Sequence, residues 1–461
     1  MAGDTTTSRK GRRRSRPSVW LWELRFKVGP NLWVVPFLMA GTTIVIFTIT
    51  RRLDRIWVPQ DDGIQSLLPE WLLVHTAVDA DVVLSAFLSA LATVLALVFS
   101  ISVLTFSMAA AQLGPRLIRR FMLDRVTQIT LGAFLSSIVM CALTLGSVST
   151  KPGHLPTVSY SVSVVMSLSC FFLLIVYVHR VATSIQSPRV IAGVVADLNR
   201  SLDEAAAYLP DVMRSTDPDT LRVAIERGRS SGAPLDAEAT GYLQALDHLY
   251  LLGAAESHGA VVVMEHRVGQ FVVEGQPLAR VYPPDQAASM RNKLHEAAVI
   301  GETRTREQDI EFALNQVVEI ALRALSPAVN DTFTGRTCVD WLSATLGRMG
   351  STPDPTGGLC DREGTLRVVE PPLRFERQLR NAFDSIRQAG ANNPAITLRM
   401  LDALAELGRT VLPSNLPAVR RYADTVRESA MIAALTAVDA ADVESRFGAV
   451  VAAVDLRSTD V

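Results

Sequence analysis

Residues 82–115 read VVLSAFLSALATVLALVFSISVLTFSMAAAQLGP, and none of these 34 positions carries Asp, Glu, Lys or Arg. As an α-helix that rises 1.5 Å per residue, the stretch would be about 51 Å long, whereas the hydrocarbon core of a bilayer is about 30 Å thick. Buried helices of soluble proteins are usually shorter and keep a polar face. The stretch therefore predicts a membrane-spanning helix that tilts, kinks or extends beyond the bilayer.

Three further apolar segments accompany it. Residues 28–50 and 126–150 are uncharged over 23 and 25 positions, and a fourth segment has its apolar part at 158–178. The chain of 461 residues is 49% apolar and only 20% charged, below the roughly 25% charge of a soluble domain. This composition excludes an ordinary soluble enzyme and a disordered chain. It predicts an α-helical polytopic membrane protein whose transmembrane domain, 28–179, has four helices at about 28–50, 82–113, 126–150 and 158–178.

The distribution of basic residues predicts the orientation. The N-terminal tail, residues 1–27, carries eight Lys and Arg, and two more follow the fourth span. The loop after the second span contributes four: Arg116, Arg119, Arg120 and Arg125. The alternate loops hold only four in total. Because Lys and Arg accumulate in cytoplasmic loops, we expect a multi-pass membrane protein with both termini cytoplasmic.

The N-terminal tail itself has two interpretations. Its Lys and Arg predict attraction to anionic lipid at about 1 kcal/mol per charge, with the lipid bilayer as partner. Alternatively, the tail is disordered and only sets the topology. The apolar segment that follows is longer than the 7–15 residues of a signal peptide's apolar region, which predicts a retained signal anchor.

Residues 180–461 are polar and predict a cytoplasmic α+β domain. Within 259–283, β-type residues punctuated by Gly269 and Gly275 indicate three short strands joined by tight turns. We expect a small β-barrel-like module there, and a helical remainder that ends in a C-terminal bundle. The stretch 267–279 is similar to the turn of modules that carry biotin or lipoate, but it lacks their attachment Lys, so no covalent cofactor follows.

The usual catalytic and ligand-binding motifs are missing from the sequence. There is no phosphate-binding P-loop, no H-E-x-x-H and no G-x-S-x-G. The four Cys and seven His show no paired ligand spacing, so we expect neither a metal nor another cofactor. A net charge of −1 argues against nucleic acid as a partner. The spans lack acidic and basic side chains apart from His179 at one end. This lack argues against proton-coupled transport and against intramembrane proteolysis, because both depend on ionisable residues within the membrane. The sequence therefore predicts no enzyme.

Small and hydroxylic residues form a stripe along the second span. At 100° per residue they fall within an arc of about 80°, with Val103 interrupting the series. The polar members of the stripe are Ser85, Ser89, Thr93, Ser100 and Ser107, accompanied by Ala96 and Ala111. One interpretation is a seam that lets helices approach closely. The other is the wall of a pore formed by several copies of the chain.

A polar loop marks a second candidate site. It contains Asn330, Asp331, Thr334 and Arg336. Asp331 or Thr332 can cap the following helix by accepting a hydrogen bond from its first free N–H groups. Alternatively, the four side chains bind a ligand or contact the membrane domain.

Several blocks resemble a known family. Residues 99–103 (FSISV) and 114–134 (GPRLIRRFMLDRVTQITLGAF) are similar to the core of a bacterial family of predicted membrane proteins, the domain of unknown function 2254. Further blocks follow in the family's order at 179–185, 241–247, 304–312 and 324–334, so the resemblance spans about 20–421. It implies an inner-membrane location and four spans with a cytoplasmic domain. It brings no established activity, substrate or catalytic residue.

Two hypotheses for the function follow. The stripe favours an oligomeric channel-like or permeation protein, a homo-oligomer with the second span near its axis. The polar loop and the β-rich module favour a membrane-anchored sensor or scaffold whose cytoplasmic domain binds a partner or a small ligand.

Overall fold

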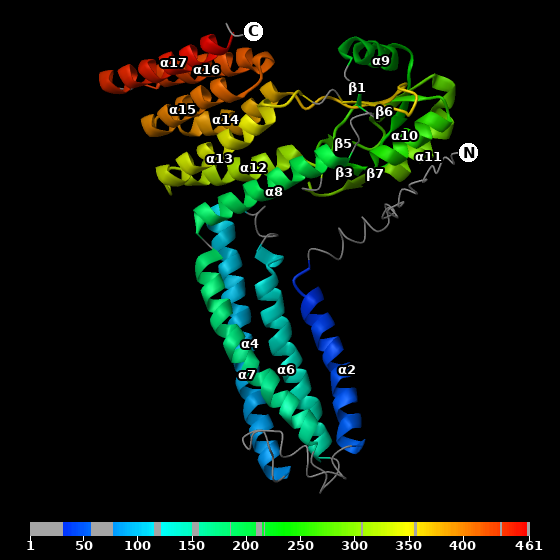
Figure 1. The fold of residues 1–461 in the computed structure, drawn as a ribbon, viewed down its shortest axis with the longest axis vertical. Helices are drawn as coiled ribbons and strands as arrows, with labels where there is room; N and C mark the ends of the chain where they lie inside the picture. Colours follow the sequence, from blue (N-terminus) through cyan, green and yellow to red (C-terminus); the bar gives the residue numbers. More distant parts are fainter. Residues whose placement is uncertain are drawn as a thin grey trace, which may run out of the picture.

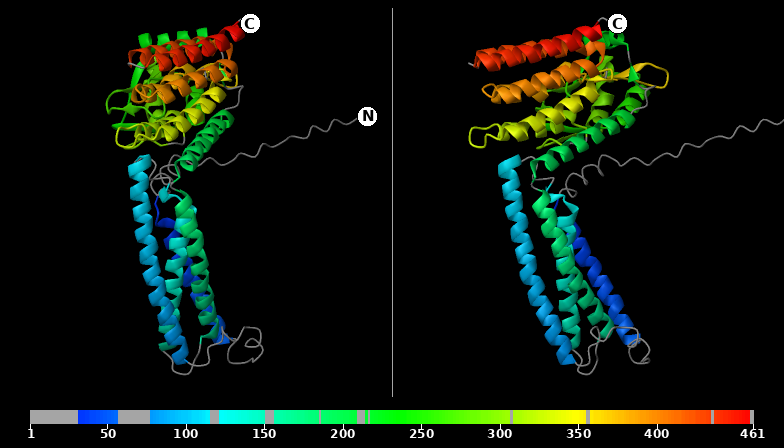
Figure 2. Two further views of the ribbon diagram at one scale, coloured as in Figure 1. Left: turned by 90° about the vertical axis from the view of Figure 1, so that its left-hand side faces the viewer. Right: turned by 60° about the vertical axis from the view of Figure 1, so that its left-hand side comes forward.

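Figure 1 shows an elongated molecule in which a bundle of long helices carries a larger region at one end. The computed structural model describes residues 31–56, 77–114, 121–149, 156–184, 186–208, 214–215, 217–305, 308–354, 357–433 and 436–458. The expected N-terminal tail, 1–27, and Arg116, Arg119 and Arg120 lie outside these residues. The two further views in Figure 2 show the same two-part arrangement, with α4 standing at one side of the bundle.

The bundle contains four helices that are long and apolar enough to cross a membrane. They are α2 (Val34–Ile56), α4 (Ala77–Leu113), α6 (Arg125–Ser149) and α7 (Thr157–Ser184). Helix α6 contacts each of the other three and is the most buried of the four. The bundle is therefore organised around α6, and α2, α4 and α7 leave much of their apolar surface on the outside.

Hydroxyl and thiol groups pair across the interface between α6 and α7. Each pair lies at hydrogen-bond distance, 3.1–3.4 Å, inside the bundle: Ser137 with Cys170, Cys141 with Ser167, and Thr144 with Ser163. A lipid core offers no water as an alternative partner. These pairs satisfy polar side chains between two helices and align α6 with α7 along their length.

A carboxylate closes the end of the bundle that lies away from the C-terminal region. Asp54, near the end of α2, is only 2% exposed. It accepts hydrogen bonds from the backbone N–H of Val158 at 2.7 Å and from the hydroxyl of Ser159 at 2.6 Å. The first N–H groups of a helix have no partner within that helix. Asp54 therefore caps α7 from a different helix, and it ties α2 to α7 across more than a hundred residues of sequence.

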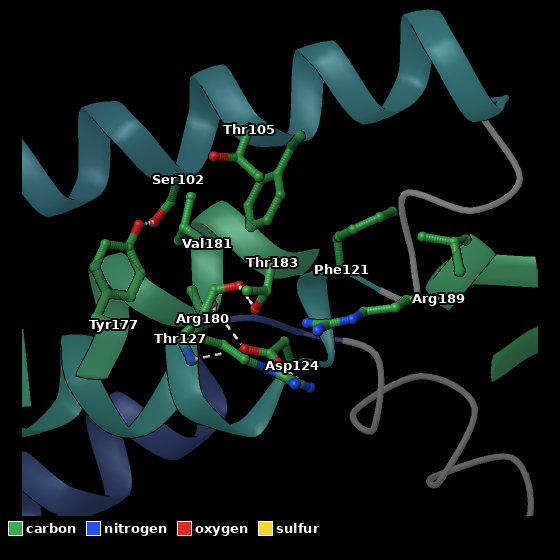
Figure 3. A pocket seen from close by; sticks show the side chains of 12 residues that line it. Ser102, Thr105, Phe121, Asp124, Thr127, Tyr177, Arg180, Val181, Thr183 and Arg189 are labelled. Carbon is green, nitrogen blue, oxygen red and sulfur yellow. Dashed lines mark hydrogen bonds and ion pairs between the residues drawn. The ribbon is translucent and has the colours of Figure 1, made fainter. Parts of the chain in front are cut away.

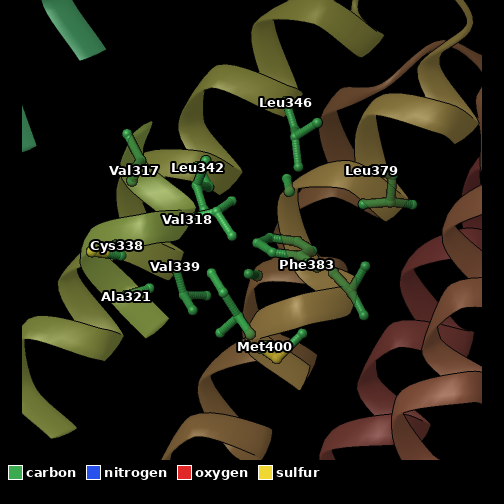
Figure 4. Packing of buried hydrophobic residues seen from close by; sticks show 14 of the residues in the cluster. Val317, Val318, Ala321, Cys338, Val339, Leu342, Leu346, Leu379, Phe383 and Met400 are labelled. Atoms are coloured by element: carbon green, nitrogen blue, oxygen red, sulfur yellow. The ribbon is translucent and has the colours of Figure 1, made fainter. Parts of the chain in front are cut away.

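A stack of helices forms one half of the C-terminal region (Figure 1). Its members are α8 (Ser187–Tyr208), α12 (Ile310–Ala324), α13 (Thr332–Gly350), α14 (Phe375–Ala389), α15 (Pro394–Thr410), α16 (Leu416–Ile432) and α17 (Ala437–Ser458), with a 3₁₀ turn at Pro413–Asn415. Figure 4 shows Phe383 and Met400 among aliphatic side chains of α12 and α13 in their shared core. Ala109 of α4 and Phe121 belong to the same core. The bundle and the helical stack are thus joined by continuous apolar packing.

Two small sheets and three helices form the other half. The larger sheet has the order β1 (Arg214–Ser215), β8 (Gly358–Cys360), β9 (Leu366–Val369), β4 (Val261–Met264), β6 (Pro277–Tyr282), β2 (Ala233–Asp236). The smaller has the order β5 (Phe271–Val272), β3 (Gly241–Leu246), β7 (Ala298–Gly301). The accompanying helices are α9 (Pro218–Ser231), α10 (His248–Ser257) and α11 (Ala287–Ala297), with a 3₁₀ turn at Pro284–Gln286.

The expected small β-barrel at 259–283 is wrong, although all three of its short strands exist. Strand β4 pairs with β6 as a local hairpin would, but it also pairs in parallel with β9, through Val262 and Val368. Strand β5 pairs with β3 in the other sheet. Among the described residues these strands form open sheets and no closed barrel. The unpaired edges of the short strands take partners from distant parts of the chain, so the β-rich part extends from residue 214 to 369.

A partly buried ion cluster connects the sheets to the helical stack. Glu311 at the start of α12 contacts Arg267 at 2.7 Å, Gln378 at 3.0 Å and Arg377 at 3.2 Å. Burial alone would raise the pKa of Glu311. The hydrogen bond from Gln378 and the two guanidinium groups outweigh burial and lower that pKa below its ordinary value. Glu311 is therefore a carboxylate whose negative charge stabilises the fold.

Beside this cluster a glycine makes room for a second carboxylate. Asp309 caps α12 through the N–H of Phe312 and pairs with Arg304 at 2.7 Å. A Cβ on Gly269 would lie 2.2 Å from the carboxylate of Asp309, and the φ of Gly269 is +92°. Only glycine meets both conditions, because it has no Cβ and it tolerates positive φ.

We predict that Glu311→Gln destabilises the protein in a pH-dependent way. A lowered pKa in the folded state contributes stability above the unfolded pKa of about 4.3, and that stability disappears as the pH falls through the folded value. Removing one partner of a buried ion pair costs on the order of 3 kcal/mol at neutral pH. Thermal unfolding of the full-length protein in detergent, followed by circular dichroism at pH 7 and pH 4, measures the difference from the wild type.

The matched control is Glu274→Gln, because Glu274 is exposed and its side chain has no ionic partner among the described residues. It should unfold as the wild type does at both pH values. A loss of stability in Glu311→Gln that is equally large at pH 4 would contradict the electrostatic explanation.

Candidate functional site

The small-polar stripe of α4 faces outward from the chain. Ser89, Thr93, Ser100 and Ser107 are exposed, and Ser85 is half-buried. Thr93 donates its hydroxyl to the carbonyl of Ser89 at 2.9 Å, a bond within α4 itself. Apart from the half-buried Ser85, the stripe is not used to pack α4 against its own bundle.

Helix α4 packs through the opposite face. Its fully buried aliphatic residues are Leu84, Leu91 and Val98, which recur every seven positions. At 100° per residue they lie about 140–180° around the helix from the centre of the stripe. The face that carries the small-polar residues is therefore free to meet lipid, water or another copy of the chain.

A pocket lies where α4, α6, α7 and α8 meet at the end of the bundle nearest to the C-terminal region (Figure 3). Its volume is about 160 Å³. Phe106, Phe121, Val181 and Val190 form its apolar lining, and Ser102, Thr105, Asp124, Thr127, Tyr177, Arg180, Thr183 and Arg189 form its polar lining. We refer to this cavity as the junction pocket.

Hydrogen bonds hold most polar groups of the junction pocket in place. The hydroxyls of Ser102 and Tyr177 lie 2.6 Å apart in a buried position, and Tyr177 also donates to the carbonyl of Val98. Asp124 accepts from the backbone N–H and the hydroxyl of Thr127, both at 3.0 Å, and so caps α6. These groups form a fixed wall whose hydrogen-bonding capacity is largely used within the protein.

The two arginines are the polar groups that remain available. Arg180 reaches one oxygen of Asp124 at 3.4 Å, and its side chain is 54% exposed. The guanidinium of Arg189 has no hydrogen bond or ion pair with any described residue, and in Figure 3 it points toward Asp124 and Arg180. The pocket therefore presents two cations and one carboxylate that a helix already uses.

The polar loop at 330–336 is mainly a helix cap. Asp331 accepts a hydrogen bond from the N–H of Thr334 at 3.0 Å and from its hydroxyl at 2.6 Å. The bonds from Thr334 hold the pKa of Asp331 below its ordinary value. Asn330 adopts a left-handed backbone with a φ of 48°, which Asn tolerates better than most residues. Arg336 lies exposed on the first turns of α13.

The turn between α12 and α13 and the first turn of α13 also expose apolar side chains. Phe333 is 80% exposed, and Val329 is exposed as well. The end of α12 contacts the end of α4, because Arg323 donates to the carbonyl of Ala111 at 2.9 Å. The turn thus belongs to the same end of the C-terminal region as the junction with the bundle.

The basic loop contributes Phe121 and Asp124 to the junction pocket, but none of its described cations. Arg125, its one described cation, is the first residue of α6, lies exposed and does not line the pocket. The sequence alone does not indicate that Asp124, Tyr177 and Arg189 are neighbours of Arg180. The only signal was the basic character of Arg180 and Arg189 after the fourth span, which was interpreted for orientation alone.

No group of three His, Cys, Asp or Glu in the described ranges is placed to hold a metal ion. The four cysteines are all buried, and none of them forms a disulfide. Cys141 and Cys170 belong to the α6–α7 interface, and Cys338 lies in the core of the helical stack. Their surroundings indicate structural roles for these three thiols.

Comparison with known proteins supports the resemblance seen in the sequence. The model of one family, described as "Predicted membrane protein (DUF2254)", matches residues 30–406. Similar chains include uncharacterised proteins of Mycobacterium bovis and of Mycobacterium tuberculosis, each 29% identical over 380 residues. The aligned part covers 79% of this chain and 70% of the relative. No solved structure matches the chain.

We predict that Asp331→Ala lowers stability by about 1 kcal/mol, the usual contribution of a side-chain N-cap. Arg336→Ala is the matched control, because Arg336 lies two positions beyond Thr334 and takes no part in the cap. Thermal unfolding of the two variants in detergent separates the interpretations. Equal stability of Asp331→Ala and the wild type would contradict the capping role and would leave the ligand interpretation.

Proposed function

The chain belongs to the DUF2254 family of predicted membrane proteins, and we propose that it is an oligomeric, channel-like protein of the inner membrane. Several copies would place α4 around a common axis, with the C-terminal region on the cytoplasmic side. The single observation that carries this proposal is the outward position of the stripe on α4. The polar, small-residue face of the helix lies opposite its packed face.

The hydroxyls of the stripe favour contact with another copy of the chain or with water over contact with lipid alone. Lipid tails cannot form hydrogen bonds, so an exposed row of hydroxyls gains nothing from them beyond bonds to its own backbone. Small residues let two helices approach closely, and hydroxyls then bond across the contact. In a ring of α4 helices the stripe would face the axis of the ring. The aliphatic side chains beside the stripe, such as Leu97 and Leu104, would then contact lipid.

The length of α4 supports a role for the C-terminal region in this assembly. At 37 residues α4 is about 55 Å long, well over a bilayer core of about 30 Å. Its last turns reach the helical stack, where Ala109 enters the core and Ala111 accepts the bond from Arg323. Contacts between C-terminal regions of neighbouring copies would therefore set the spacing and tilt of the α4 helices.

The stripe predicts the character of the path. Its side chains are hydroxyls and methyl groups with no ionisable group, so the wall donates and accepts hydrogen bonds without favouring one sign of charge. A path lined in this way suits small neutral solutes or ions of weak selectivity. Any charge selectivity would have to come from the ends of α4.

Charge placement supports the cytoplasmic position of the C-terminal region. Arg125, Arg180 and Arg189 lie at the end of the bundle that meets this region. By the positive-inside preference these cations support a cytoplasmic position for that end. The fourteen-to-four distribution of Lys and Arg in the sequence points the same way.

A membrane-anchored sensor or scaffold is the second candidate. The exposed Phe333 and Val329 at the turn between α12 and α13 support it, because exposed apolar residues in a group mark contact sites more often than isolated ones do. In that case the turn would bind a partner, and α4 would serve only as an anchor.

We predict that Ser89→Leu and Ser100→Leu abolish the conductance of the reconstituted protein. Each places a large aliphatic side chain in the middle of the stripe, where it would close and dewet a narrow path. Single-channel current across planar bilayers, recorded with a salt gradient, is the measurement. Ala90→Leu is the matched control, because Ala90 is exposed on α4 but lies about 100° around the helix from the stripe's centre.

Cross-linking tests the assembly separately from the current. Ser100→Cys should form disulfide-linked dimers in membranes under mild oxidation, whereas Ala90→Cys should not, and the native cysteines are all buried. Current that survives Ser100→Leu would remove the pore role. Absence of Ser100→Cys dimers would remove the axial position of α4.

A further inference from the structure

We propose that the junction pocket binds a phosphate ester, and that its occupant is the headgroup of an anionic phospholipid from the cytoplasmic leaflet. The site is separate from the stripe on α4 and does not depend on the channel proposal. Four observations carry it: the charge balance, the free donors, the shape of the cavity and its depth in the bundle.

The charge balance favours an anion. Two guanidinium groups, Arg180 and Arg189, line the cavity together with one carboxylate, Asp124. The carboxylate is occupied by Thr127, whose N–H and hydroxyl both bond to one of its oxygens. The remaining oxygen faces Arg180 at 3.4 Å, which is long for a hydrogen bond. A net positive charge is left for a ligand.

Free donors are the second observation. Arginine presents five N–H groups in a planar fork that matches the oxygens of a phosphate. The guanidinium of Arg189 has no partner among the described residues, and the guanidinium of Arg180 has only the long contact with Asp124. Figure 3 shows both residues at the same opening, one from α7 and one from the start of α8. A phosphate between them would be held from two helices.

The shape of the cavity suits an amphiphile. A cavity of roughly 10–15 Å³ by the same measure holds one water molecule, so 160 Å³ accommodates a phosphate with its glycerol linkage. Phe106 and Val181 provide an apolar wall beside the charged groups. A soluble phosphate would use only the charged half, whereas a lipid would use both.

The depth of the pocket points to the headgroup layer. It lies where α7 ends, where α6 begins and where α8 leaves the bundle. Trp33 at the start of α2 contacts Phe99 of α4, with ring centroids 5.7 Å apart, one turn from Ser102. Tryptophan is enriched at the boundary between lipid tails and headgroups. Basic pockets between membrane helices at this level are typical sites for anionic headgroups.

The test uses full-length protein in nanodiscs of phosphatidylcholine that contain a minority of phosphatidylglycerol. Native mass spectrometry should detect one phosphatidylglycerol retained per chain. The double variant Arg180→Gln/Arg189→Gln should weaken this retention about a hundredfold, because it removes both guanidinium groups and a charge-assisted hydrogen bond from each contributes about a factor of ten. Val181→Phe should weaken it without changing charge, because the larger side chain fills the cavity.

Two controls make the result specific. Arg125→Gln removes an exposed cation at the same depth that does not line the pocket, and it should retain the lipid. Ser100→Leu should retain it too, which separates this site from the stripe. A second arm titrates the protein in pure phosphatidylcholine nanodiscs with glycerol 3-phosphate, a soluble ligand with the same phosphate chemistry.

The outcomes distinguish a phospholipid from a soluble phosphate ester as the ligand. Phosphatidylglycerol that is lost in the double variant and in Val181→Phe, but kept in Arg125→Gln, supports the lipid. Binding of glycerol 3-phosphate with no lipid retention supports the phosphate site and assigns it to a soluble ligand. Binding of neither, or an Arg125→Gln effect equal to that of the double variant, overturns the proposal. Should the double variant not fold, Val181→Phe decides between these results.

Discussion

Polar groups inside the apolar bundle find their hydrogen-bond partners within the protein, with few exceptions, and the architecture depends on this constraint. The hydroxyl and thiol pairs between α6 and α7 meet it along the interface. Asp54 meets it at one end by capping α7 from α2. The hydroxyls of Ser102 and Tyr177 meet it near the other end. Two buried hydroxyls of α6, those of Thr130 and Ser136, have no hydrogen-bond partner among the described residues. The hydroxyls of the stripe on α4 face outward in a row, and Thr93 bonds only within its own helix, to Ser89.

The second organising feature is the shared core between the bundle and the helical stack. Ala109 and Phe121 pack among residues of α8, α12 and α13. Packed interiors transmit displacement because they have few voids to absorb it. A movement of α4 would therefore displace helices of the C-terminal region, and contacts made by that region would change the position of α4. The helical stack is therefore in a position to influence the arrangement of the bundle helices, whichever function the protein has.

The stripe and the junction pocket occupy neighbouring positions on one helix. Ser100 belongs to the outward stripe, and Ser102 lies buried at the pocket. A headgroup held by Arg180 and Arg189 would join the corner between α7 and α8 to the face of α4. Under the two proposals together, the composition of the cytoplasmic leaflet would influence the arrangement of the α4 helices.

The sequence alone determined the features that depend on local composition. Uncharged runs predicted four apolar helices, β-type residues predicted the strands β4, β5 and β6, and the position of Asp331 after Pro327 predicted a cap. These follow from each segment's own preference for lipid, sheet or helix end. Only the tertiary structure decided which face of α4 lies outside, that β4 pairs with β9, that Asp54 caps α7, and that Arg180 and Arg189 share a pocket. Each of these requires residues far apart in the chain to meet, and the packing of whole helices against one another sets such encounters.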